Sequence, residues 1–143
     1  MRKNLNFLAF VFTAILITIA GCEKDKEKPL DELILGKWEK QSAYYAFYEN
    51  NVKTGEQGDT FDPNEYVYEV LKGGTGNIYE DGTITQTFTW TLVGTSLTIE
   101  NPNELTEGDI SIENNILTLE GTETSTSNGI LYENYKVITF KKV

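Results

Sequence analysis

Apolar and polar residues alternate along most of the chain after Pro29, and this period of two predicts strands rather than helices. The segment 83–92 shows the pattern most clearly, with large apolar side chains on one face and threonines on the other. The apolar face carries Phe88, Trp90 and Leu92, and the other carries Thr87, Thr89 and Thr91. Periodicity is compatible with threonines that line an interior and with threonines that face solvent. Turn-forming residues recur about every ten residues, which is typical of an all-β sandwich or barrel.

We predict about eight short strands, joined by local turns, and one longer insertion near residues 50–64. The strands are expected at residues 38–48, 66–71, 77–80, 83–92 and 97–100, in the two arms of a hairpin over 109–121, and at 135–143. Asp81-Gly82 and Asn114-Asn115 mark hairpin turns, because these residues accept a positive φ. A meander of about eight strands closes into a barrel wide enough for one small ligand. The predicted fold class is therefore all-β, a small antiparallel up-and-down β-barrel.

The start of the chain carries a different pattern, in which Arg2 and Lys3 precede an uncharged apolar run over residues 7–20. A positively charged start followed by an apolar stretch is the layout of a secretory signal peptide. A helix of this length spans about 21 Å, which is short of the roughly 30 Å hydrocarbon core of a bilayer. The run therefore predicts a signal peptide rather than a membrane span.

The apolar run ends at Ile19-Ala20-Gly21-Cys22, which contains the only cysteine of the chain. This stretch resembles the lipobox of bacterial lipoproteins, in which an aliphatic residue and two small residues precede a lipidated cysteine. The resemblance implies cleavage before Cys22, a diacylglycerol on its sulfur and an acyl chain on its new amino group. Several chains together would give a stable membrane anchor, which one chain does not. The alternative is an ordinary signal peptide followed by an accidental cysteine.

We divide the chain into a lipoprotein signal peptide over residues 1–21, a lipidated cysteine with a charged tether over 22–31, and one domain over 32–143. The tether alternates in charge, which is typical of a solvated segment. The first expected partner is therefore the membrane, through the N-terminal lipid, and the expected location is the cell envelope. An Asp directly after the cysteine would resemble an inner-membrane retention signal. Glu23 stands there instead, which favours the outer membrane, with the domain either periplasmic or surface-exposed.

A second resemblance covers residues 32–143. Gly36-Lys37-Trp38, just before the first predicted strand, resembles the G-x-W signature of lipocalins. The order and spacing of the predicted strands that follow, down to the final segment at 138–143, are similar to the lipocalin-like domain of bacterial lipoproteins. The resemblance implies a lipocalin-like barrel. Lipocalins often stack a C-terminal Arg on the G-x-W tryptophan; the domain has no Arg, but Lys141 or Lys142 could supply the cation.

Composition argues against several classes of function. The mature chain would keep 10 lysines (12 Lys and Arg, less Arg2 and Lys3) against 22 Asp and Glu, a net charge of −12. It has no cluster of Lys for a phosphate backbone, so we expect no nucleic-acid partner. The chain has no histidine for a Ser-His-Asp triad or an imidazole metal site, and no spacing singles out a pair of carboxylates. We expect no enzymatic activity, no cofactor and no metal, and we interpret the acidic segments 58–66 and 100–109 as solvated loops.

Six aromatic residues are candidates for ligand contact: Trp38, Tyr44, Tyr45, Phe47, Tyr48 and Trp90. The two tryptophans are best explained as core residues, because a large aromatic side chain usually serves the core. The four rings at 44–48 point to both faces of one strand, so some must lie outside the core. Exposed rings with hydroxyl tips suit sugar or peptide binding. The simpler alternative is that Tyr45 and Phe47 pack inside, whereas Tyr44 and Tyr48 cover an end of the barrel.

The leading functional hypothesis is a non-catalytic binding module that holds a small apolar or amphipathic ligand inside the barrel. The alternative is an interaction protein whose barrel is filled by its own side chains and whose rim or loops contact a partner protein. These hypotheses predict different interiors, because a carrier needs a pocket of about 300 Å³ or more and a scaffold needs none.

Overall fold

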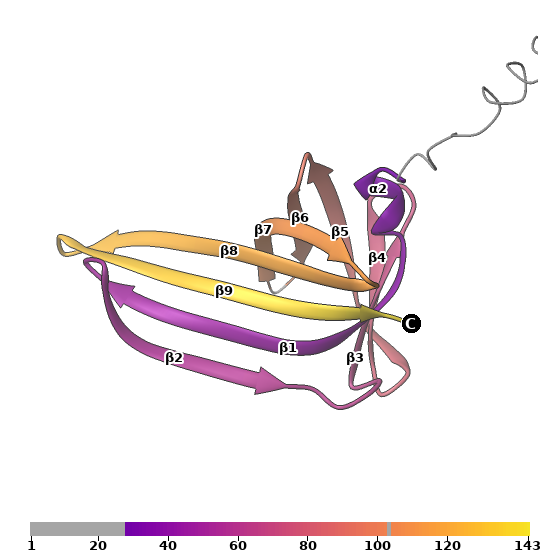
Figure 1. The fold of residues 1–143 in the computed structure, drawn as a ribbon, viewed down its shortest axis with the longest axis horizontal. Helices are drawn as coiled ribbons and strands as arrows, with labels where there is room; N and C mark the ends of the chain where they lie inside the picture. The colour runs from indigo at the N-terminus through magenta and orange to yellow at the C-terminus, as the bar shows by residue number, and fades with distance from the viewer. Residues whose placement is uncertain (1–27, 103) are drawn as a thin grey trace, which may run out of the picture.

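The computed structural model describes residues 28–102 and 104–143, so the signal-like segment and Cys22 lie outside the described residues. The described chain forms one nine-stranded antiparallel sheet in the order β2-β1-β3-β4-β5-β6-β7-β8-β9, preceded by a short helix, α2 (Figure 1). The elements are α2 (Leu30–Leu33), β1 (Gly36–Glu49), β2 (Val52–Thr60), β3 (Tyr66–Leu71), β4 (Thr75–Glu80), β5 (Thr83–Val93), β6 (Ser96–Asn101), β7 (Glu104–Glu113), β8 (Ile116–Ser127) and β9 (Ile130–Lys142).

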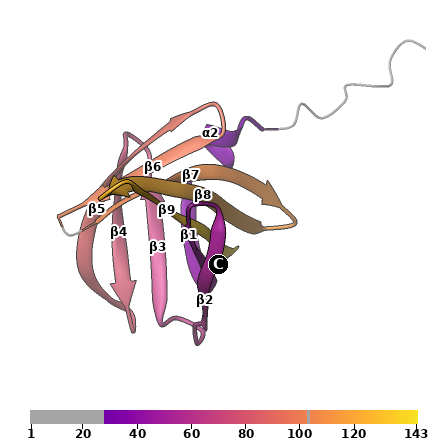
Figure 2. The ribbon, with the colours of Figure 1, turned by 90° about the vertical axis from the view of Figure 1, so that its left-hand side faces the viewer.

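The sheet closes on itself because β1 pairs with β9 as well as with β2 and β3. The result is a closed antiparallel barrel of eight strands, β1 and β3 to β9, plus β2 as one extra strand. Figure 2 shows β3, β4 and β5 side by side in the barrel wall. The predicted all-β barrel is therefore confirmed, together with its hairpin turns. Asp81, Asn114 and Asn115 all have positive φ.

Two segments differ from the sequence-based expectation. The insertion near residues 50–64 contains β2, which was missed because neither of its faces carries a row of apolar residues. The segment 100–109, expected to be a solvated loop, is largely the end of β6 and the start of β7. β2 and the first part of β7, residues 104–109, consist mainly of exposed polar residues, so hydrogen bonding to neighbouring strands places them in the sheet without an apolar face.

The long strand β1 lies first in the barrel wall and then in a sheet outside the barrel. Its first part, Gly36 to Glu39, pairs with β3 inside the barrel, and its second part, Ser42 to Glu49, pairs with β2 outside it. The register with β9 shifts between Lys40 and Ser42, and such a bulge bends a strand. Strands β8, β9, β1 and β2 therefore continue beyond the barrel as a four-stranded sheet, residues 42–60 and 121–136, which we term the blade (Figure 1).

Two glycines mark the point where β7 stops pairing with β8 and the blade begins. β7 pairs with β8 only from Asp109 to Glu113. A Cβ at Gly121 would lie 2.6 Å from the carbonyl oxygen of Glu107, and one at Gly108 would lie 2.6 Å from the carbonyl oxygen of Glu120. Glycine at both positions lets the backbones of β7 and β8 lie this close together at the point beyond which the two strands diverge.

The barrel core is closed at one end by Trp38 and Ile34, each only 1% exposed. The indole Nε1–H of Trp38 donates to the carbonyl oxygen of Ile34 at 2.6 Å. Lys142 lies with its Nζ 4.9 Å from the centre of the Trp38 ring and donates to the carbonyl oxygen of Leu33 at 2.9 Å. A C-terminal lysine thus supplies the cation expected beside this tryptophan. The exposed threonines Thr87, Thr89 and Thr91 show that the threonine face of β5 points to solvent.

We expect Gly121→Ala to lower the free energy of unfolding by about 1–3 kcal/mol, because the new Cβ would be forced against the backbone of β7. Gly58→Ala is the matched control, since a Cβ at this glycine of β2 meets nothing within 4 Å. Its effect should stay within about 0.5 kcal/mol. Urea denaturation followed by tryptophan fluorescence measures both variants, and equal stabilities would contradict the role assigned to Gly121.

Candidate functional site

Among the described residues, the closed end of the barrel is filled by its own side chains. The apolar cavity among the core residues, which include Trp38, Tyr68, Leu119 and Phe140, measures about 20 Å³. That is close to the space for a single water molecule, whereas small-molecule sites measure on the order of 300–1,000 Å³. In this part of the described chain the arrangement resembles a packed core rather than a ligand cavity.

Tyr68 shows how the interior is filled by aromatic rings. Its ring lies 5.3 Å from that of Phe140 in an edge-to-face arrangement and 6.2 Å from that of Phe88. Such pairs contribute about 0.5–1.5 kcal/mol beyond the area they bury. Burial, with a smaller effect of the Glu104 carboxylate, raises the pKa of Tyr68 to about 12. The neutral phenol is therefore an integral part of the core.

The two tryptophans named as candidates both have structural partners. Trp38 belongs to the closed end of the core, as described above. The indole of Trp90 donates to the carbonyl oxygens of Leu71 and Thr75, at 3.0 Å each, and its backbone N–H donates to the carbonyl oxygen of Gly74 at 2.8 Å. Trp90 thus stabilises the turn between β3 and β4, and neither indole N–H is left to bind a ligand.

The four aromatic residues at 44–48 lie on the blade, on opposite faces. Tyr45 and Phe47 continue the face that lines the barrel interior, which we term the inner face; Tyr45 packs against the core, and Phe47 remains 39% exposed. Tyr44 and Tyr48 continue the outside of the barrel, which we term the outer face. They do not cover an end of the barrel, because β1 leaves the barrel before it reaches them.

A third tyrosine joins this pair on the outer face. Tyr135 of β9 lies directly opposite Ala46, and the Tyr44 and Tyr48 side chains are close enough to contribute to raising its pKa. Ala46, between the rings in sequence and register, is only 1% exposed. The Tyr135 hydroxyl donates to Oε1 of Glu120 at 2.7 Å, and this hydrogen bond is the main cause of the raised pKa of Tyr135. The side chain of Tyr135 is therefore held in place by Glu120.

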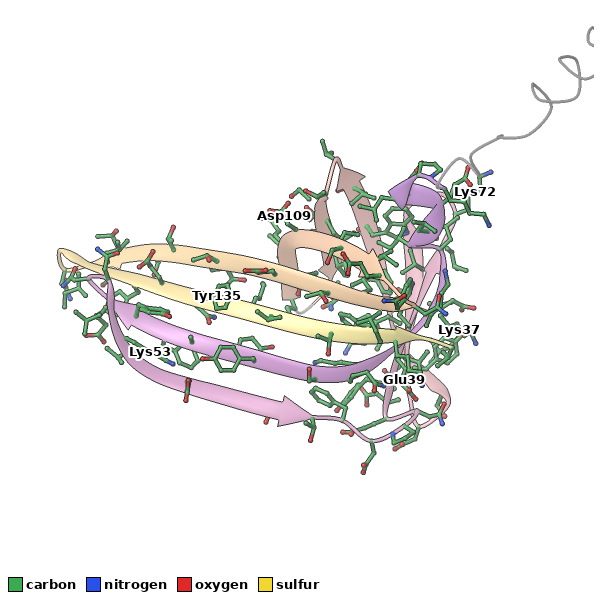
Figure 3. All side chains as sticks on the ribbon, in the orientation of Figure 1. Lys37, Glu39, Lys53, Lys72, Asp109 and Tyr135 are labelled. Atoms are coloured by element: carbon green, nitrogen blue, oxygen red, sulfur yellow. The ribbon has the colours of Figure 1, made fainter. Side chains whose placement is uncertain are left out.

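The outer face is hollowed on both sides of Tyr135. One hollow of about 460 Å³ lies where the blade leaves the barrel, lined by residues that include Asp109, Ser111, Thr118, Glu120, Thr122 and Tyr135. A second hollow of about 380 Å³ is lined by Tyr48, Asn51, Thr122, Glu133 and Tyr135. Since the two share Thr122 and Tyr135, they form one feature, which we term the outer groove. Figure 3 shows Asp109 on β7 and Tyr135 midway along β9.

The outer groove follows from the geometry of the sheet. Asp109 is paired with Glu120, Thr122 with Tyr135, and Tyr48 with Glu133, so all these side chains point to the same side. The blade separates from β7 at Gly121, itself a lining residue. The separation of the strands at these glycines therefore places the hollow beside a row of hydroxyl and carboxylate groups.

The inner face carries buried charge instead. Lys136, opposite Tyr45, is only 4% exposed, and its Nζ forms an ion pair with Glu123 Oε1 at 2.5 Å. The neighbouring Asn134 has a buried Oδ1 without a hydrogen-bond partner. Lys40 lies 4.3 Å from the centre of the Phe61 ring, and burial lowers the pKa of Lys40.

The sequence pattern did not single out Tyr135, Glu120 and Thr122 as site residues, although it contained one relevant signal. Asn128-Gly129, a favoured hairpin turn, joins β8 to β9, and both residues have positive φ. The turn sets the register that places Thr122 opposite Tyr135. The separation of β7 from β8 had no comparable signal in the sequence.

Among residues 28–102 and 104–143 no helix is long and apolar enough to cross a membrane, and no group of three potential metal ligands comes together. Comparison of the chain with protein-family models, curated proteins and solved structures finds no match.

The raised pKa of Tyr68 predicts a loss of stability at alkaline pH. The folded protein holds the phenolic proton up to about pH 12, whereas the unfolded chain releases it near pH 10. The stabilisation is therefore fully present below pH 10 and is lost between about pH 10 and 12, by about 2–3 kcal/mol at most. Urea titrations across this range should show a shallower decline for Tyr68→Phe than for the wild type. Parallel declines would contradict a buried neutral phenol.

Proposed function

We propose that this protein is a lipid-anchored cell-envelope protein that acts as a non-catalytic interaction module, with a filled barrel that carries the blade as its contact surface. The observation behind this proposal is the contrast in free space. The cavity among the core side chains has a volume of about 20 Å³, whereas the two hollows of the outer groove have volumes of about 460 and 380 Å³. Aromatic rings and free space therefore coincide outside the barrel, where a partner can reach them.

The carrier hypothesis is less well supported than this alternative. A ligand inside the barrel would have to displace rings such as Trp38, Tyr68 and Phe140, which pack against one another or against the backbone. Opening a cavity in a close-packed core costs free energy that the ligand would have to return. The outer groove needs no such displacement, because its hollows are already open.

The anchor rests on the sequence around Cys22. The described residues begin at Lys28, shortly after the lipobox-like stretch. An extended tether of about ten residues would reach roughly 33 Å. That length would let the blade meet partners beyond the headgroups of the membrane to which the lipid is attached.

Native mass spectrometry of the full chain, purified in mild detergent from its own host, tests which surface binds. We expect the mass of the lipidated polypeptide without a retained small apolar molecule. A stoichiometric apolar ligand that is lost on denaturation would support the carrier hypothesis and overturn the proposal.

Photo-crosslinking in cells tests the blade directly. A photoreactive side chain at Thr124, an exposed residue on the outer face, should give a discrete crosslinked product. The same group at Thr87, an exposed residue on the barrel wall, is the matched control and should give none. Equal crosslinking from both positions, or none from Thr124, would argue against the blade as the contact surface.

Replacement of Cys22 tests the anchor. We expect Cys22→Ser to move the protein from the membrane fraction to the soluble envelope fraction and to abolish incorporation of labelled fatty acid. Retention of label in the variant would place the lipid elsewhere or refute lipidation at this residue.

A further inference from the structure

We propose that the outer groove binds a neutral oligosaccharide, with sugar rings stacked on Tyr48 and Tyr135 and sugar hydroxyls bonded to the acidic and hydroxyl groups around them. The inference rests on the proposed function, since it names the class of molecule that the blade contacts. Four properties of the groove support it: its shape, its rings, its acceptors and its lack of positive charge.

The shape suits a chain of several small units rather than one compact molecule. The two hollows, about 460 and 380 Å³, meet at Thr122 and Tyr135 and extend from β7 across β8 and β9 to the end of β1. Both are open to solvent along the outer face, so a polymer could lie along the groove and continue beyond it at either end.

The rings provide flat apolar surfaces at the centre and at one end. Tyr135 lies between the two hollows, and Tyr48 lines the second. The hydrogen bond from Tyr135 to Glu120 fixes the orientation of the central ring before any ligand arrives. A ring held in this way binds at a lower entropic cost than a mobile one. The C–H face of a pyranose is an apolar surface that fits such a ring.

The acceptors match the hydroxyl groups of a sugar. Asp109 accepts a hydrogen bond from the Thr95 hydroxyl at 2.9 Å, and Glu120 accepts one from Tyr135, each through a single oxygen. The second oxygen of each carboxylate remains able to accept hydroxyl donors. The two carboxylates lie directly opposite each other on paired strands. Like charges at such positions are destabilising, and hydroxyl donors from a ligand would offset part of that cost.

The charge of the groove selects against other ligands. Among the described residues that line the two hollows none is cationic, and three are Asp or Glu. Phosphate, sulfate and acidic sugars are therefore disfavoured. A basic peptide would meet exposed carboxylates, but exposed ion pairs contribute only about 0–1 kcal/mol each and weaken with salt. A neutral polyhydroxylated chain uses both the rings and the acceptors.

The test is isothermal titration of the full chain in detergent with neutral gluco-, manno- and xylo-hexasaccharides, with an oligogalacturonate as the acidic counterpart. We expect at least one neutral oligosaccharide to bind and the acidic one not to bind. Raising NaCl from about 50 to about 500 mM should change Kd less than about twofold, because the ligand is uncharged. Absence of binding across the neutral panel would overturn the proposal.

Matched variants on one strand locate the site. Tyr135→Ala should weaken binding at least about tenfold, since it removes the central ring, whereas Tyr132→Ala should change Kd less than about twofold. Tyr132 lies on the same strand but on the inner face, where it pairs with Glu49. Glu120→Gln keeps the ring and reduces acceptor strength, so it gives a second measure if Tyr135→Ala does not fold.

Two further outcomes would contradict the proposal that the outer groove binds an oligosaccharide, but they would not contradict the proposed function as an interaction module. Oligosaccharide binding that persists unchanged in Tyr135→Ala and Glu120→Gln would place the site elsewhere. Binding of an oligolysine peptide that falls steeply with salt, without sugar binding, would assign the groove to a basic partner. In either case a crosslink from Thr124, and a native mass without a retained apolar ligand, would still support the proposed function.

Discussion

The structure depends on the pairing of β1 with β9, which closes the barrel and also builds the blade. The same two strands pair from Trp38 opposite Lys142, inside the barrel, to Glu49 opposite Tyr132, at the far end of the blade. A barrel without this pairing would expose two unpaired edges, which invite aggregation. Because the pairing is longer than the barrel is deep, the remainder of both strands must leave the barrel as a sheet, and β2 and β8 pair alongside them.

Because of this closure, the part of the sheet that forms the packed core differs from the part that is open to a partner. At the barrel end, Trp38, Tyr68 and Phe140 fill the interior, so the closed sheet serves as a packed core. At the blade end no other described element forms a second layer on the sheet, and a ring on each face stays exposed to solvent, Tyr44 at 36% and Phe47 at 39%. Tyr135 and Glu120 are fixed by a hydrogen bond there rather than by burial. The surface available to a partner thus exists because these strands are long enough to continue beyond the barrel.

Much of the fold could be predicted from particular residues. The alternation of Phe88, Trp90 and Leu92 placed β5, and the Asn and Asp residues with positive φ placed the hairpins, because both signals are local. The cation beside Trp38 was also predictable from the lysines at the C-terminus. The strand β2 was not, because a strand with two exposed faces has no apolar row to reveal it. The outer groove was not predictable either, because Tyr48 of β1 is distant in sequence from the residues of β7, β8 and β9 that complete it, and because nothing local marks where β7 separates from β8.

By itself the sequence determined the hairpin turns and the strands that have an apolar face, since backbone φ preferences and a period of two depend only on neighbouring residues. Only the tertiary structure decided which face of each strand is buried, because an alternating pattern is the same whichever face turns inward. It placed the threonines of β5 outside, and it decided that Tyr44 lies on the outer face of the blade and Tyr45 on the inner face. It also decided that the described core is filled and that the two hollows of the outer groove lie outside it. Those outcomes depend on which strands close against each other, and that choice is made by the whole sheet.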